Sequence, residues 1–160
     1  MDRKLEEYFK KHDINYVKHE HPAVFTVEES KFLKSKIPGM HCKSLFLKDE
    51  KRKFYLVCMN AFKRLNMKGL RKKMGLSGKL QFASPEELKE ELNLTPGSVS
   101  IFGMIYAKKT KLIIDLEVWN ADIVGFHPNI NTSTWEIKHI DLEKFYNSIK
   151  AGREIINLDE

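Results

Sequence analysis

Two apolar, aromatic-containing runs in the middle of the chain constrain the fold most. Residues 43–47 and 54–59 each have the length and composition of a buried strand. The segment between them is wholly charged, Lys48-Asp49-Glu50-Lys51-Arg52-Lys53. A polar connection of this length between two apolar runs predicts a β-hairpin with a longer loop. The middle of the chain is therefore expected to be rich in β-structure.

Other short apolar runs predict further strands. They lie at residues 15–19, 79–82, 98–102, 111–116, 123–126 and 132–137, with an edge strand at 154–157. With 160 residues, of which 42% are hydrophobic, the chain can bury one core but is short for two ordinary domains. We predict a single α/β domain of the α+β type over residues 1–160, with a curved, mostly antiparallel mixed sheet flanked by helices.

Helix signals fall between these runs. Leu5, Tyr8 and Phe9 recur at helical spacing and predict an amphipathic helix over residues 3–12. The sequence Ser84-Pro85-Glu86-Glu87 has the residues of a capping box with proline at the first helical position. Four helices are thus expected to begin at Thr26, Asn66, Ser84 and Asp141 and to end near residues 37–39, 74, 92 and 149.

Charge and cysteine content narrow the function classes. Cys42 and Cys58 both lie in apolar runs, which favours buried free thiols over a disulfide framework. No window approaches the roughly 18 apolar residues of a membrane span, and the polar N-terminal residues do not resemble a signal peptide. We therefore expect a cytoplasmic protein without a membrane partner.

A basic cluster gives a first indication of a partner. The formal net charge is +6, from 28 Lys and Arg against 22 Asp and Glu, which favours encounters with polyanions. In a helix over residues 66–74, Lys68, Arg71 and Lys72 share one face, with Lys73 beside them. This pattern suits a phosphate-binding surface, but an ordinary solvated helix face has the same composition.

Three segments contain residues that could carry chemistry, although the glycine-rich nucleotide loops, the Gly-x-Ser-x-Gly elbow and Cys-x-x-Cys are all absent. Lys43 lies in a run suited to a buried strand, where a lysine needs an anion or a path to water. Gly97 opens a loop that could present backbone N–H groups, or could be an ordinary turn. His127 lies in a turn rich in amide and hydroxyl side chains. His19, His21 and His41 offer a metal site only weakly, because no carboxylate joins them at a recognisable spacing.

Taken in order, four segments resemble the YbaK/prolyl-tRNA editing family, and the resemblance covers nearly the whole chain. They are HPAVFTVEE at residues 21–29, KSLFL at 43–47, FASPEEL at 82–88 and FHPNINT at 126–132. The free-standing editing proteins of this family are the most similar branch. The resemblance implies the fold of the editing domain that is associated with prolyl-tRNA synthetase.

The resemblance also assigns roles. Lys43 matches the family's essential lysine and His127 its loop histidine, so both are expected to be catalytic. The Gly97 loop matches a Gly-x-x-x-Pro element, in which Ile101 here replaces the proline and its stiffness. The expected substrate-binding residues are Phe25, Thr26, Ser44, Gly97, Ser98, Val99, Ser100, Ile101, Asn129 and Thr132, and the expected tRNA-binding residues are Lys68, Arg71, Lys72 and Lys73.

The function implied is hydrolysis of mischarged aminoacyl-tRNA, most simply removal of alanine from tRNA(Pro). The family is thought to use a ribose hydroxyl of the tRNA itself, so no metal or organic cofactor is expected. The partner is the tRNA acceptor end, and the sequence leaves open whether a prolyl-tRNA synthetase docks. Two alternatives stay open: deacylation of another small aminoacyl-tRNA, such as cysteinyl- or seryl-tRNA, and a non-catalytic tRNA-binding module on the same fold.

Overall fold

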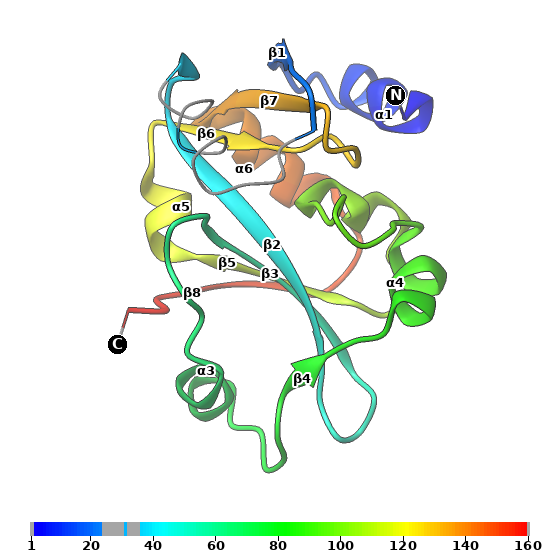
Figure 1. Ribbon diagram of the computed structural model, residues 1–160, viewed down its shortest axis with the longest axis vertical. Coiled ribbons are helices and arrows are strands. Elements are labelled where there is room, and N and C mark those ends of the chain that lie inside the picture. The colour runs from blue at the N-terminus through cyan, green and yellow to red at the C-terminus, as the bar shows by residue number, and fades with distance from the viewer. Residues whose placement is uncertain (1, 24–30, 32–35, 160) are drawn as a thin grey trace.

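A computed structural model of the protein describes residues 2–23, 31 and 36–159. Within these residues eight strands form one mixed sheet, with helices on both faces (Figure 1). The strands are β1 (Val17–Glu20), β2 (Met40–Lys48), β3 (Phe54–Asn60), β4 (Gln81–Phe82), β5 (Lys111–Asp115), β6 (Ile123–Phe126), β7 (Ser133–Lys138) and β8 (Arg153–Ile156). The helices are α1 (Arg3–Lys11), α3 (Met67–Lys73), α4 (Pro85–Leu92), α5 (Leu116–Asn120), α6 (His139–Ser148) and the 3₁₀ helix η1 (Ile101–Tyr106).

Strand β2 joins the two halves of the sheet. Its first residues pair in parallel with β6, most of its length pairs antiparallel with β3, and its last residues pair with β4. The strand order β1-β7-β6-β2-β3-β5-β8 therefore places β2 at the centre and β8 at an edge. Four of these strand pairs are antiparallel and three are parallel. The predicted hairpin, the edge strand and the mixed, mostly antiparallel sheet are confirmed.

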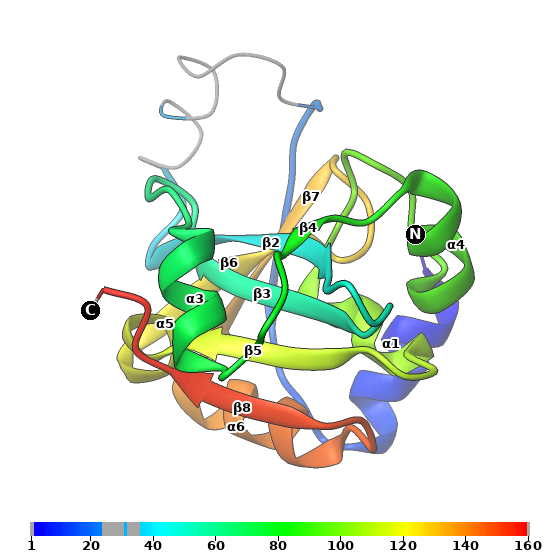
Figure 2. The ribbon, with the colours of Figure 1, turned by 90° about the horizontal axis from the view of Figure 1, so that it is seen from below.

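Side chains of β2 alternate between two differently covered faces. Cys42 and Phe46 belong to the larger apolar cluster, to which α1, α4, α5, α6 and η1 contribute. Leu45 and Leu47 face the other way and pack in a smaller cluster with Leu70 of α3. Figure 2 shows α3 on one side of the sheet and α1 and α6 on the other. Among the described residues, no helix has the length and apolar character needed to cross a membrane.

The capping box predicted at the start of α4 is present. The Ser84 hydroxyl accepts the Glu87 N–H at 3.1 Å, and the Glu87 carboxylate accepts the Ser84 N–H at 2.8 Å. Lys48, the last residue of β2, also donates to that carboxylate at 2.9 Å. The Ser84 N–H and the Lys48 ammonium together lower the pKa of Glu87 to about 2. This ion pair fastens α4 to the end of the central strand.

Both cysteines lie in the core, as predicted. Cys42 is 8% exposed and Cys58 is fully buried, and both thiols are free. Burial and the neighbouring Cys42 thiol raise the pKa of Cys58. A thiol in this environment stays protonated near neutral pH, so Cys58 has no nucleophilic character.

The strand predicted at residues 98–102 is wrong. Ser100 instead caps η1, because its hydroxyl accepts the N–H of Phe102 at 3.1 Å. Ile101, Phe102 and Met104 are all buried in the larger cluster. A continuous apolar run in a core fits a strand and a buried helix equally well, so its pattern could not distinguish them.

The prediction that Asp141 caps the last helix is also wrong. Helix α6 begins at His139, with Lys138 in the cap position and no side-chain cap bond. Asp141 is 5% exposed inside the first turn, where it accepts the N–H of Asn15 at 2.9 Å. The Asp141 carboxylate therefore makes a tertiary hydrogen bond and does not cap the helix.

One predicted element cannot be compared. The helix expected to open at Thr26 falls on residues 24–30 and 32–35, which lie outside the described residues. The same holds for the expected substrate-binding residues Phe25 and Thr26. The remaining predicted strands and the helices at residues 3–12 and 66–74 are present, with shifts at their ends.

Candidate functional site

The two expected catalytic residues lie on one face of the sheet. Strands β2 and β6 pair in parallel, with His41 opposite Gly125. The side chains of paired residues project to the same side of the sheet. Because side chains alternate along a strand, the next residue but one projects to that side too. Lys43 lies two residues beyond His41, and His127 lies two residues beyond Gly125, just past the end of β6, so this register directs both toward the same face. Cys42 and Phe126, between these positions, point into the core. The register joins residues that are far apart in the chain (Figure 1).

Lys43 lies within β2, opposite Met59 of β3, and is partly buried. Burial lowers the pKa of its ammonium. In the part of the chain that the structure describes, no carboxylate lies within ion-pair distance of it, whereas Lys48 at the end of the same strand pairs with Glu87 at 2.9 Å. The lysine at the strand end is thus Lys48, and Lys43 is a mid-strand cation without a protein counter-charge among these residues.

Hydrogen bonding fixes the tautomer of His127. Its Nδ1 lies 3.0 Å from the carbonyl oxygen of Ser133. A carbonyl oxygen can only accept, so Nδ1 carries the proton. In the neutral ring Nε2 then holds the lone pair, which is the form required for accepting a proton or a hydrogen bond.

Ser100 brings the Gly97 loop to His127. Its hydroxyl donates to the backbone carbonyl of His127, and Ser100 is 2% exposed. Of the residues expected in this loop, Ser100 alone among the described contacts makes that connection. Gly97 has φ +88°, where a side chain is strained, and a Cβ there would meet nothing within 4 Å. The loop is tied at its Ser100 end and open at Gly97.

Several expected substrate-binding residues lie elsewhere. Ile101 is fully buried in the core and Val99 packs against the same cluster, so Ile101 contributes packing rather than an accessible surface. Ser44 follows Lys43 directly and faces the opposite side of the strand, next to Cys58. Ser98 closes a turn by donating its N–H to Thr95 O. Thr132 is exposed, and its carbonyl accepts the N–H of His21.

Further histidines line the same face. His21 hydrogen-bonds Thr134 Oγ1 through Nε2 at 2.9 Å, and its ring centroid lies 6.3 Å from that of His127. His41 is 7% exposed, beside Gly125, where an added Cβ would lie 3.7 Å from the His41 ring and 3.2 Å from Thr134. The sequence indicated His21 and His41 as weak metal candidates and His21 also as part of the family's opening segment, but it gave Gly125 and Thr134 no role. The described residues contain no group of three or more potential ligands placed to hold a metal ion.

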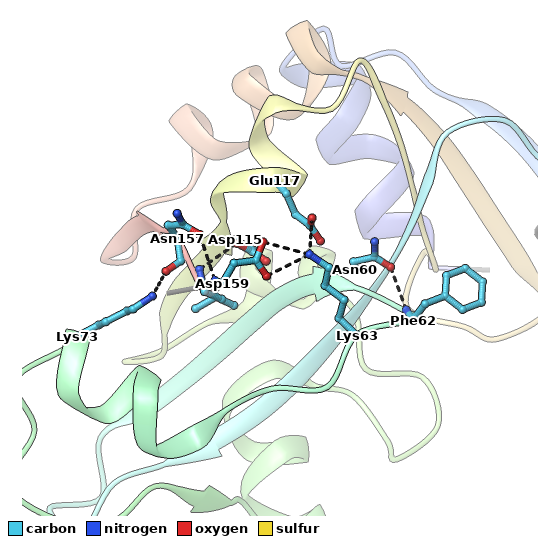
Figure 3. A network of polar contacts seen from close by, with 9 residues as sticks. Asn60, Phe62, Lys63, Lys73, Asp115, Glu117, Asn157 and Asp159 are labelled. Atoms are coloured by element: carbon cyan, nitrogen blue, oxygen red, sulfur yellow. Dashed lines mark hydrogen bonds and ion pairs between the residues drawn. The ribbon is translucent and has the colours of Figure 1, made fainter.

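The basic residues of α3 lie on the Lys43 side of the sheet, because Leu70 of α3 packs with Leu45 and Leu47. Lys68 and Lys72 are exposed and Arg71 is half-buried. Lys73 is different, since it donates to the carbonyl of Asn157 (Figure 3). Lys63 also has partners in the protein, since it forms ion pairs with Glu117 at 2.7 Å and with Asp159 at 3.1 Å. The available cations on this helix are thus Lys68, Arg71 and Lys72.

A surface hollow of about 690 Å³ lies away from these residues. It is formed by α1 and the segment that follows it, and it is lined by Arg3, Glu6, Glu7, Phe9, Lys10, Asp13, Ile14, Asn15 and Tyr16. Charges of both signs alternate around it, and neither Lys43 nor His127 contributes. The polar face of β2 and β6, rather than this hollow, holds the groups capable of chemistry.

Comparison with known proteins gives consistent matches. Residues 21–145 match the model of the aminoacyl-tRNA editing domain. The prolyl-tRNA editing protein ProX of Acetoanaerobium sticklandii is 37% identical over 82% of this chain and 81% of its own length. Prolyl-tRNA synthetase associated domain-containing protein 1 of Danio rerio is 30% identical over 99% of this chain and 88% of its own.

A solved structure shares the fold. It is described as a candidate trans-editing enzyme for prolyl-tRNA synthetase, and it superposes with a TM-score of 0.75 over 100% of this chain and 99% of its own. Its sequence identity of 18% supports the architecture alone. The observed sheet and helices are therefore those of a known fold.

Replacing Lys43 tests whether its ammonium lacks a counter-charge in the folded protein. Lys43→Met keeps the unbranched stem and removes a partly buried charge, so the free energy of unfolding in urea at neutral pH should rise by about 0.5–1 kcal/mol. Lys48→Met is the matched control on the same strand, and it should lower that free energy because Glu87 loses the nearer of its two ion-pair partners, Lys48 and Arg52. Equal destabilisation by both substitutions would contradict the assignment.

Proposed function

Since the chain belongs to the aminoacyl-tRNA editing domain family, we propose that it is a trans-editing deacylase that hydrolyses mischarged tRNA(Pro), with alanyl-tRNA(Pro) as its substrate. The proposal is supported above all by the register of β2 and β6, which directs Lys43 and His127 toward one face. Among the described residues no carboxylate pairs with the Lys43 ammonium, which suits a polyanionic substrate. An imidazole with its lone pair on Nε2 suits proton transfer.

The chemistry requires little beyond positioning and electrostatics. Water attacks the ester carbonyl, a negative charge develops on the carbonyl oxygen, and the C–O bond to the ribose breaks to give the free amino acid and the tRNA. The ammonium of Lys43 supports the developing negative charge or the adjacent phosphate. Nε2 of His127 accepts a hydrogen bond from the attacking water or from a ribose hydroxyl. An aminoacyl ester is already activated, so no protein nucleophile is needed.

Alanine is the expected target because a prolyl-tRNA synthetase can attach it to tRNA(Pro) by mistake. A pocket shaped for proline cannot reject a smaller amino acid strongly, since one or two missing methylenes are worth only about 1–3 kcal/mol. A second site that accepts only the smaller product removes the error. The relative named as a prolyl-tRNA editing protein, 37% identical to this chain, supports tRNA(Pro) as the nucleic acid involved.

Helix α3 provides a surface for the acceptor stem. Lys68, Arg71 and Lys72 lie on the same side of the sheet as Lys43. They are four or fewer residues apart along one helix face, which suits successive phosphate groups. Lys73 is a weaker candidate, because its ammonium already binds the carbonyl of Asn157.

Deacylation assays test the reaction and its specificity. The purified protein should release alanine from alanyl-tRNA(Pro) faster than it hydrolyses prolyl-, cysteinyl- or seryl-tRNA. Lys43→Ala and His127→Ala should each lower the single-turnover rate by about 10²–10³-fold. Lys150→Ala, which removes an exposed lysine just after α6, should have no effect. Turnover of a different ester would move the specificity, and no turnover of any ester would refute the proposal in favour of a binding module.

Charge reversal tests the role of α3. The triple variant Lys68→Glu, Arg71→Glu, Lys72→Glu should weaken tRNA binding by at least tenfold and lower the slope of log affinity against log salt by about 2–3. The matched control reverses the exposed Lys4, Lys10 and Lys11 of α1, on the opposite face of the sheet. An unchanged affinity and salt slope for the α3 variant would mean that the tRNA follows another surface.

A further inference from the structure

One carboxylate near the N-terminus joins three segments that are distant in sequence. Asp2 caps α1 by accepting the N–H of Leu5 at 3.2 Å. The hydroxyl of Tyr106, in η1, lies 2.8 and 2.7 Å from its two oxygens. The side-chain amide of Asn129 donates to Asp2 Oδ2 at 3.1 Å. The first turn of α1 is thereby attached to the His127 loop, the segment of residues 127–132 between β6 and β7.

The contact with Asn129 fixes the position of that loop. Asn129 follows His127 by two residues, and other attachments of the loop lie toward its two ends, where Thr132 O accepts the N–H of His21. Ser100 donates to the backbone carbonyl of His127, and the His127 ring donates to Ser133 O at 3.0 Å. The bond to Asp2 is the attachment made by the middle of the loop. The amide of Asn129 is used within the protein, which differs from its expected contact with substrate.

The loop holds Asn129 in a conformation that is unfavourable by itself. Its φ is +65°, in the left-handed region that asparagine tolerates better than most residues. An ionised carboxylate only accepts hydrogen bonds, so the NH₂ group must face Asp2. Asn129 Oδ1 is then buried without a hydrogen-bond partner in the described part of the chain, at a cost of about 1–3 kcal/mol. Surrounding contacts that maintain such a geometry are typical of functional sites.

The electrostatics favour a charged link. Burial raises the pKa of Asp2, but hydrogen bonds from Tyr106, Asn129 and the Leu5 N–H outweigh it, and the net pKa lies below its ordinary value. Burial and the Asp2 carboxylate raise the pKa of Tyr106, which keeps its hydroxyl protonated as a donor. Hydrogen bonds to an ionised carboxylate are stronger than neutral ones, so this link is stiff at neutral pH.

We propose that Asp2 is a positioning residue for His127: through Asn129 it fixes the His127 loop, and with it the orientation and Nδ1–H tautomer of the imidazole. This proposal rests on the proposed deacylase function. Asp2 touches no reacting atom. Its contribution is to keep Nε2 aimed at the aminoacyl ester, so its loss should lower the rate of the chemical step more than substrate binding.

The experiment compares two disruptive variants with a matched control. Asn129→Gly removes the amide and accepts the positive φ without strain. Asp2→Asn places an amide against the amide of Asn129. The control is Asp13→Asn, just beyond α1, whose exposed carboxylate pairs with Lys144 at 3.6 Å and does not contact the loop. Asn129→Gly and Asp2→Asn should lower kcat by about 10–100-fold with KM changed less than threefold, and Asp13→Asn should match the wild type.

A second measurement needs no substrate and separates this inference from the proposed function. Nitrogen-15 chemical shifts of the His127 ring report the tautomer, and they should show predominantly protonated Nδ1 in the wild type and a mixture of tautomers in Asp2→Asn and Asn129→Gly. Unchanged His127 shifts in both folded variants would overturn the inference even if the protein is an active deacylase. Changed shifts would support it even if the substrate were another ester. A lower melting temperature with unchanged kcat and shifts would reduce Asp2 to a helix cap and also overturn it.

Discussion

The parallel pairing of β2 with β6 is the interaction on which the site depends. It sets His41 against Gly125 and so directs Lys43, two residues further along β2, and His127, just past the end of β6, toward the same face. A shift of one residue would turn one of the two side chains into the core. The apolar side chains of Cys42 and Phe126 oppose such a shift, because they are buried on the other face. Core packing therefore fixes the geometry of the polar groups.

One face of the sheet contributes mainly to stability, and the other carries the polar groups of the proposed site. The larger cluster buries five helical elements against one face and supplies most of the apolar burial. The other face has α3 at one end of β2 and histidines, Thr134 and Lys43 toward the other. Within the described residues Lys43 is desolvated without an acidic partner, a cost that hydrophobic packing elsewhere offsets. The C-terminal residues add to this arrangement, since Asn157 and Asp159 bind Lys73 and Lys63 beside α3 (Figure 3).

Local signals made much of this fold predictable. The hairpin of β2 and β3 followed from two apolar runs and a charged turn, and α4 followed from the Ser84 capping box. Lys43 and His127 could be named from the family resemblance, but their shared face depends on strand register, which no local pattern contains. The strand predicted at residues 98–102 was wrong because an apolar run is compatible with both a strand and a buried helix. The role of Asp2 was beyond sequence reasoning, since its partners Tyr106 and Asn129 are more than a hundred residues away.

The most direct test of the shared face is chemical-shift mapping with an adenosine that carries alanine on its 3′ carbon through an amide, a stable mimic of the aminoacyl-tRNA end. The largest backbone and side-chain shifts are expected at residues 41–43 of β2 and at residues 125–134, which span the end of β6, the His127 loop and the start of β7. Lys43→Met should also weaken binding of the mimic. The largest shifts at the hollow beside α1, with Lys43 and His127 unaffected, would show that the aminoacyl end does not bind at the face of Lys43 and His127.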